Sequence, residues 1–132
     1  MTYLLDTNAI IDIIDNNKIV IERFKQTYAH SAIRIPDIVF YEIKRGFDYS
    51  DKKNQLPVFL EFEKRCNVVY QTRKSLEIAA KNYALLSKAG TPIEDGDLLI
   101  GSLAITENAV LVTNNTKHLS RLPGIQLENW TI

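Results

Sequence analysis

The chain has 132 residues, of which 45% are hydrophobic and 24% charged, and its 16 basic residues balance 16 acidic ones. These values fit one globular domain spanning residues 1–132, while the neutral charge counts modestly against a protein that binds nucleic acid through a basic surface. The single cysteine excludes a disulfide framework within the chain. The sequence shows no signal peptide and no apolar run of transmembrane length, which predicts a cytoplasmic protein with no membrane partner.

Short apolar runs and helical patterns alternate along the first half of the chain. Tyr3–Leu5 predicts a strand, and Thr7 or Asn8 is expected to cap the helix that follows. The elements expected next are a helix at 19–28, a strand at 33–35, a helix at 37–47, a polar loop at 48–57 and a helix at 58–65.

The second half continues the same alternation. We expect a strand at 67–70, a helix at 75–89, a helix at 95–106, a strand at 109–113, a short helix at 116–121 and an edge strand at 125–127. Gly90 ends the helix at 75–89, on which Leu76, Ala79, Ala80, Tyr83 and Leu86 form the stripe expected to be buried. Continuous apolar strands alternating with helices predict an α/β fold, a parallel sheet covered on both faces, with ligands at the carboxyl ends of its strands.

Three acidic residues far apart in the sequence are candidate metal ligands. Asp6 follows the first strand, Glu42 lies in the helix after the second strand, and Asp97 begins a helix that is apolar nearly all round. A carboxylate at the mouth of a buried segment must be hydrated, paired or bound to a cation, and three together indicate divalent metal and phosphate chemistry. Each also has a simpler explanation as a helix cap or a solvated side chain, with Asp95 the better cap for the helix that contains Asp97.

Other familiar sites are absent from the sequence. His30 and His118 are too isolated to form a metal pair, and there is no C-x-x-C. The candidate ligands are therefore all oxygen atoms, which favours Mg²⁺ or Mn²⁺ over zinc. There is also no P-loop, no G-x-G-x-x-G and no G-x-S-x-G motif.

Four segments together form a recognisable pattern: L-L-D-T-N-A-I-I-D, V-F-Y-E-I-K-R-G, G-T-P-I-E-D-G-D-L-L-I-G-S-L-A and V-L-V-T-N-N-T-K-H-L-S-R-L-P-G-I-Q-L-E-N-W. In this order and spacing they resemble the PIN-domain family, specifically VapC-type toxins of toxin–antitoxin pairs, over essentially the whole chain. The resemblance implies a three-layer α/β/α sandwich with a short central parallel sheet. It also implies a metal-dependent endoribonuclease that cleaves RNA, often structured RNA such as tRNA, and that is neutralised by an antitoxin.

The resemblance assigns roles to individual residues. Asp6 and Asp97 correspond to metal ligands for Mg²⁺, with Mn²⁺ as a substitute, and Glu42 completes the catalytic set directly or through water. Where many relatives carry a further acid after the fourth strand, this chain has two asparagines, and Asp95 is a candidate for the missing charge. The residues expected to orient ligands or substrate are Thr7, Asn8, Asp95, Thr113 and Asn114.

The segment at 56–62 holds more apolar side chains than one buried helix stripe requires, namely Leu56, Val58, Phe59, Leu60 and Phe62. We expect part of this patch to be covered by a second copy of the chain, giving a homodimer, or by an antitoxin.

Three alternative functions can be weighed against this resemblance, and the sequence counts against the first two. A receiver-type phosphoacceptor domain needs an Asp at the end of the third strand, where this chain reads N-V-V-Y-Q-T. A haloacid-dehalogenase-type phosphatase needs D-x-D after the first strand, where this chain reads D-T-N. A catalytically silent module that binds RNA or protein would not need to bind Mn²⁺ at its carboxylates, so a metal titration separates it from the nuclease.

Overall fold

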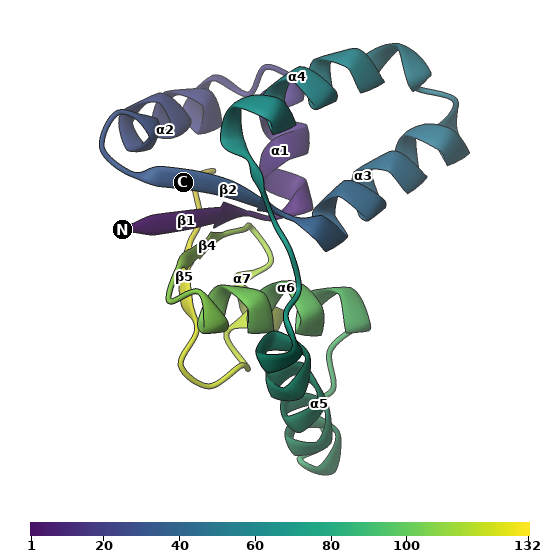
Figure 1. The fold of residues 1–132 in the computed structure, drawn as a ribbon, viewed down its shortest axis with the longest axis vertical. Coiled ribbons are helices and arrows are strands. Elements are labelled where there is room, and N and C mark those ends of the chain that lie inside the picture. Colours follow the sequence, from purple (N-terminus) through teal and green to yellow (C-terminus); the bar gives the residue numbers. More distant parts are fainter.

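A five-stranded sheet in the order β3-β2-β1-β4-β5 lies at the centre of the structure (Figure 1), a computed structural model that describes residues 1–132. The strands are β1 (Thr2–Leu5), β2 (Ala32–Pro36), β3 (Val68–Val69), β4 (Val110–Val112) and β5 (Gln126–Glu128). Each neighbouring pair is parallel, as the continuous apolar runs predicted.

Helices cover both faces of this sheet. They are α1 (Thr7–Ile14), α2 (Lys18–Tyr28), α3 (Asp37–Ser50), α4 (Leu56–Cys66), α5 (Arg73–Lys88), α6 (Asp95–Thr106) and α7 (Thr116–Leu119). Figure 1 shows α1–α4 on one side of the strands and α5–α7 on the other. The predicted three-layer α/β/α architecture is therefore confirmed. No helix has both the length and the hydrophobicity that crossing a bilayer would require.

Two helices begin with a different cap from the one that the sequence predicted. Asp6, rather than Thr7 or Asn8, is the N-cap of α1, and its carboxylate accepts a hydrogen bond from the Thr7 amide. Glu94, rather than Asp95, is the N-cap of α6, but its side chain makes no capping hydrogen bond.

The polar loop expected at 48–57 is much shorter than predicted. Helix α3 continues to Ser50, and a 3-10 turn, η1 (Lys53–Gln55), leads directly into α4 at Leu56. Asp51 ends α3 in the left-handed conformation, with φ of 60°. An aspartate tolerates this backbone better than most residues, so a single position reverses the chain where the polar composition suggested a long loop.

The buried face of α5 matches the predicted apolar stripe only in part, at Ala79 and Leu86. Leu76 and Tyr83 are 48% and 56% exposed, whereas the buried residues are Ser75, Ala79, Asn82 and Leu86. Ser75 can be buried because its hydroxyl donates to the Gln71 side chain and accepts from the Thr72 amide. An apolar surface is therefore left between α5 and α6.

The strand order places the functional candidates at one edge of the sheet. The chain builds β1, β2 and β3 outward in one direction and then returns to lay β4 and β5 on the other side of β1. The carboxyl ends of β1 and β4 are neighbours at this switch in strand order, which is where ligands of open parallel sheets bind. Asp6 follows β1 and Thr113 follows β4, so residues far apart in the sequence become adjacent.

Candidate active site

Asp6 is buried and held by three polar neighbours. Its Oδ1 accepts from the Thr7 amide at 2.8 Å, and its Oδ2 accepts from the Thr113 hydroxyl at 2.8 Å and from Asn8 Nδ2 at 3.2 Å. The Asn115 amide donates in turn to the Thr113 oxygen at 3.0 Å, which directs the hydroxyl hydrogen toward Asp6. The D-T-N motif and the residues after β4 thus form one oriented network.

The pKa of Asp6 reflects a cost of burial that its hydrogen bonds offset only in part. Burial is the main cause that raises the pKa of its carboxyl above the ordinary value, and the charge of Glu42 acts in the same direction. The hydrogen bonds from Thr113, Thr7 and Asn8 oppose the rise. The protein stabilises the charge of Asp6 with dipoles alone, since none of its four ion pairs involves this residue.

Glu42 reaches the same region from α3. Its Oε1 accepts a hydrogen bond of 2.6 Å from the Thr7 hydroxyl, so Thr7 joins Asp6 through its backbone and Glu42 through its side chain. Glu42 Oε2 lies against the first turn of α6, only 2.6 Å from where a Cβ would stand on Gly96. Only a glycine at position 96 admits the carboxylate in this orientation.

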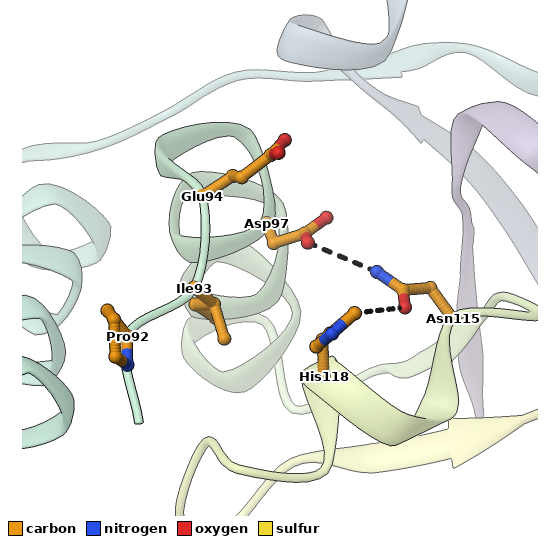
Figure 2. Close-up of a pocket in the computed structure, with 6 residues that line it drawn as sticks. All are labelled: Pro92, Ile93, Glu94, Asp97, Asn115 and His118. Atoms are coloured by element: carbon orange, nitrogen blue, oxygen red, sulfur yellow. Dashed lines mark hydrogen bonds between the residues drawn. The ribbon is translucent and has the colours of Figure 1, made fainter. Parts of the chain in front are cut away.

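Asp97 projects from the first turn of α6 into a cleft of about 600 Å³ lined by Pro92, Ile93, Glu94, Asp97, Asn115 and His118 (Figure 2). Asn115 Nδ2 donates to Asp97 Oδ2 at 3.1 Å, and His118 Nδ1 lies 2.8 Å from Asn115 Oδ1. Figure 2 shows Asn115 between the other two side chains, joining the start of α6 to α7.

The pKa of Asp97 shows that the acidic residues act on one another. Burial is the main reason that this pKa is raised to about 6. The negative charges of Asp6, Glu42 and Glu94 raise the pKa further. A positive charge on His118, present when its ring is protonated, acts in the opposite direction. The three elements that carry these acids therefore create a concentrated negative field at the switch in strand order.

The donor chemistry of the site fits a divalent cation. Asp6, Glu42 and Asp97 supply only hard oxygen ligands, and no lysine or arginine is paired with any of them. No three acidic, histidine or cysteine side chains are close enough here to form a ready-made metal cluster. Glu42 instead bonds to Thr7 and Asp97 to Asn115. The three carboxylates must converge further to share one ion.

The structure brings most of the candidates from the sequence together, but not all of them. Asp6, Thr7, Asn8, Glu42 and Thr113 are joined by direct hydrogen bonds, and Asp97 is joined to them through Asn115.

Asn114 contributes its backbone amide, which donates to Asn8 Oδ1 at 2.9 Å. Asp95 instead lines an apolar groove between α5 and α6, apart from the cleft that holds Asp97.

Sequence reasoning did not single out Glu94, Gly96 or His118 as site residues, and it offered Asn115 only together with Asn114, in place of a missing acid. The T-N-N run after β4 was the available signal for Asn115, but the sequence did not show which asparagine faces Asp97. Contact with His118 depends on where α7 packs against the start of α6, which no local pattern reveals.

Neutralising Asp97 should stabilise the metal-free protein at neutral pH. The raised pKa means that the folded state disfavours the charged carboxylate, so Asp97 favours folding most below about pH 4, and this contribution is lost as pH rises through about 6. We expect Asp97→Asn to raise the free energy of unfolding by about 1 kcal/mol at pH 7.5, because helix-dipole attraction and solvent screening offset part of the repulsion.

Urea titrations in EDTA at pH 4 and pH 7.5 measure this effect. The gain should be absent at pH 4, and Asp51→Asn, an exposed change at the end of α3, should show no such pH dependence. A variant less stable than the wild type at both pH values would mean that hydrogen bonding, rather than repulsion, dominates at Asp97.

Gly96→Ala should weaken metal binding without unfolding the protein. The new Cβ would displace the flexible end of Glu42, so the cost falls on the position of the carboxylate rather than on the backbone. We expect Mn²⁺ affinity, measured by titration calorimetry, to fall by about tenfold, the range found when the supports of metal ligands are lost. Gly46→Ala on α3 is the matched control, because its Cβ would meet open space. Equal affinities in both variants would contradict the positioning of Glu42 by Gly96.

Comparison with known proteins gives one consistent result. Residues 3–125 match the sequence profile of the PIN domain. A Rickettsia felis protein named Ribonuclease VapC2 is 36% identical over 142 residues, covering 98% of each chain. A Salmonella typhimurium protein named tRNA(fMet)-specific endonuclease VapC is 32% identical, also covering 98% of each chain. The structure of VapBC-1 from nontypeable Haemophilus influenzae is similar over 100% of both chains, with 32% identity and a TM-score of 0.89.

Proposed function

The chain belongs to the PIN-domain family, and from this premise we propose that it is a metal-dependent endoribonuclease, the toxin of a toxin–antitoxin pair. One observation carries the proposal: carboxylates from the N-cap of α1, from α3 and from the first turn of α6 gather at the carboxyl ends of β1 and β4 without a cationic partner. A site that concentrates negative charge can act on an anionic phosphodiester only if a cation is added.

Asp6 and Asp97 are proposed as the direct ligands of this cation, with Glu42 acting directly or through water. Mg²⁺ is the proposed metal and Mn²⁺ its substitute, because the ligands are oxygen atoms only. When bound, the cation supplies an activated water and a positive charge beside the scissile phosphate. Thr7 fixes the orientation of Glu42, and the Thr113 hydroxyl fixes that of Asp6.

Asn8 links these groups to the chain that follows β4. Its amide donates to Asp6 and to Thr113, while its carbonyl accepts from the Asn114 backbone. It therefore holds the start of α1 against the end of β4 and keeps the first carboxylate in place. Asp95 has no such contact, so we assign it no part in metal binding.

RNA is the proposed substrate, and a structured RNA such as a tRNA is its proposed form. Two similar proteins are named as a ribonuclease and as a tRNA(fMet)-specific endonuclease, which supports this choice. Lys117 and Arg121 lie on or beside α7, close in sequence to His118, which lines the cleft that contains Asp97. These two basic side chains would supply RNA affinity that falls as the salt concentration rises. We propose that the RNA is cleaved in the cytoplasm.

An antitoxin and a second copy of the chain are the proposed protein partners. The similarity to VapBC-1 supports an antitoxin. On α4, Phe59 is buried, but Val58 and Leu60 are 56% and 42% exposed, so only part of the patch predicted from the sequence is free. The groove between α5 and α6 is a second apolar surface, lined by Leu76, Ala79, Ala80, Tyr83, Asp95, Leu98 and Leu99.

Sequencing of RNA ends after brief induction of the protein in cells tests the proposed function. New 5′ ends at defined positions are expected with the wild type and not with Asp6→Asn, which keeps the α1 cap but loses the charge. A catalytically silent interaction module would produce the same RNA ends with both proteins.

A further inference from the structure

The hydrogen bonds around Asn115 determine which of its two amide atoms faces His118. An ionised Asp97 carboxylate can only accept, so Asn115 must turn its NH₂ group toward it, as the 3.1 Å contact shows. The Asn115 carbonyl then faces His118 Nδ1 at 2.8 Å. Because a carbonyl can only accept, Nδ1 must carry a hydrogen, and the chain from His118 through Asn115 to Asp97 runs in one direction.

This orientation leaves the second ring nitrogen of His118 available for a ligand. In the neutral ring, a hydrogen on Nδ1 means that Nε2 presents a lone pair. Nε2 has no partner in the protein, and His118 is exposed on the wall of the cleft that also contains Asp97. Arg121 donates to the Pro92 carbonyl at 3.0 Å, which ties the segment after α7 to the opposite wall of the cleft.

The carboxylates of the cleft, Asp97 and Glu94, are also acceptors, and the Asn115 NH₂ group has only one further N–H to donate. Glu94 is exposed, and its side chain makes no capping bond with α6. The Asn115 NH₂ group already donates to Asp97. A phosphate oxygen offers only further acceptors and is repelled here, whereas a ribose hydroxyl is neutral and can donate. The 2′-hydroxyl is the group that distinguishes RNA from DNA, so this wall suits a ribose better than a phosphate.

We propose that His118 is a specificity-determining residue that accepts a hydrogen bond from a 2′-hydroxyl of the RNA substrate through Nε2, and that Asn115 is the positioning residue that holds its ring. The inference rests on the proposed function, since it names the group of the RNA that this site recognises. One hydrogen bond between neutral groups changes affinity by about two- to tenfold. The contact is therefore a source of selectivity for ribose rather than of the whole affinity.

A set of fluorescein-labelled RNA stem-loops with the sequences of the arms of tRNA(fMet), the RNA in the name of one similar protein, tests the proposal. Each probe carries one 2′-deoxynucleotide, and the DNA stem-loops of the same sequences complete the set. Affinities are measured by fluorescence anisotropy in EDTA, so that no probe is cleaved. Five proteins are compared: the wild type, His118→Phe, His118→Gln, Asn115→Ala and the double variant that combines His118→Phe with Asn115→Ala. His118→Phe keeps a planar ring without Nε2, and His118→Gln restores a hydrogen-bond acceptor.

With the wild type, at least one 2′-deoxy position should weaken binding by about two- to tenfold. His118→Phe should bind the all-ribose probe weaker by a similar factor and show no further loss at that position, while its affinity for DNA stays unchanged. Asn115→Ala should behave in the same way, and His118→Gln should recover part of the loss. The protein that carries both His118→Phe and Asn115→Ala should lose no more affinity than either single variant.

Three results would overturn the proposal. The first is a wild type whose affinity no 2′-deoxy substitution changes. The second is a sensitive position that stays sensitive in His118→Phe. The third is an equal loss of RNA and DNA affinity in His118→Phe, which would indicate a phosphate contact. If one of these results is found while the wild type still cleaves the RNA probes with Mn²⁺, the role of His118 is wrong but the proposed function stands. A wild type that neither binds nor cleaves RNA would overturn the proposed function as well.

Discussion

Removing divalent metal with EDTA is expected to reduce RNA cleavage by the purified protein by more than about 100-fold. The site offers three carboxylates to an anionic substrate, so without a cation it repels the phosphate and has no positive charge to stabilise the reaction. Cleavage rates of labelled tRNA should be measured in Mg²⁺, in Mn²⁺ and in EDTA. Loss of a ligand's support alone costs 10- to 100-fold in other metal enzymes, and loss of the ion should cost more.

The same experiment needs a control for contaminating ribonucleases. Asp6→Asn, purified identically, should be inactive under all three conditions. Cleavage by the wild type that persists undiminished in EDTA and is absent from the Asp6→Asn preparation would exclude a metal mechanism. Thermal unfolding gives a readout independent of activity, because an ion that binds only the folded state stabilises it by about 2.7 kcal/mol at 100 times its dissociation constant.

Asp97→Asn is expected to reduce cleavage by more than about 100-fold while the protein remains folded. Asparagine keeps the size of the side chain and an oxygen for Asn115, but it loses the charge that would bind the cation. Its Mn²⁺-induced stabilisation should be much smaller than that of the wild type. The measurements are the cleavage rate with Mg²⁺ and melting curves of both proteins with EDTA and with excess Mn²⁺.

Asp95→Asn is the matched control for this prediction. Asp95 lies in the same turn of α6 but lines the groove toward α5, so its neutralisation should leave cleavage within a few-fold of the wild type. If Asp97→Asn retained activity and Asp95→Asn lost it, the roles assigned to these two acids would have to be exchanged. Equal Mn²⁺ shifts in the wild type and Asp97→Asn would mean that the ion binds elsewhere.

The sequence was most informative where a local pattern decides the structure. The apolar run before Asp6 and the apolar helix after Asp97 set the strand and the buried helix on which these acids lie. The alternation of such runs with helices then predicts a parallel sheet and a site at its carboxyl edge. Much of the architecture and the three principal acids could therefore be identified without the structure.

Contacts between elements were harder to predict. The helical periodicity of α5 predicts that Leu76 and Tyr83 are buried. It cannot show that Ser75, whose hydroxyl is hydrogen-bonded at the start of the helix, is buried instead. Likewise, Gly96 looks like a weak helix residue until Glu42 is found where its side chain would be. The bridge from Asp97 through Asn115 to His118 depends on the packing of α7 beside α6, a tertiary fact with no periodic signal.

The pairing of β1 with β4 has a consequence for the synthesis of the protein. The hydrogen bond from Thr113 to Asp6 joins residues 107 positions apart, and Asp97 also comes late in the chain. A nascent chain that already contains Asp6 and Glu42 therefore lacks both the third carboxylate and β4, one of the two strands that pair with β1. The order of translation thus keeps the centre incomplete until β4 has been made.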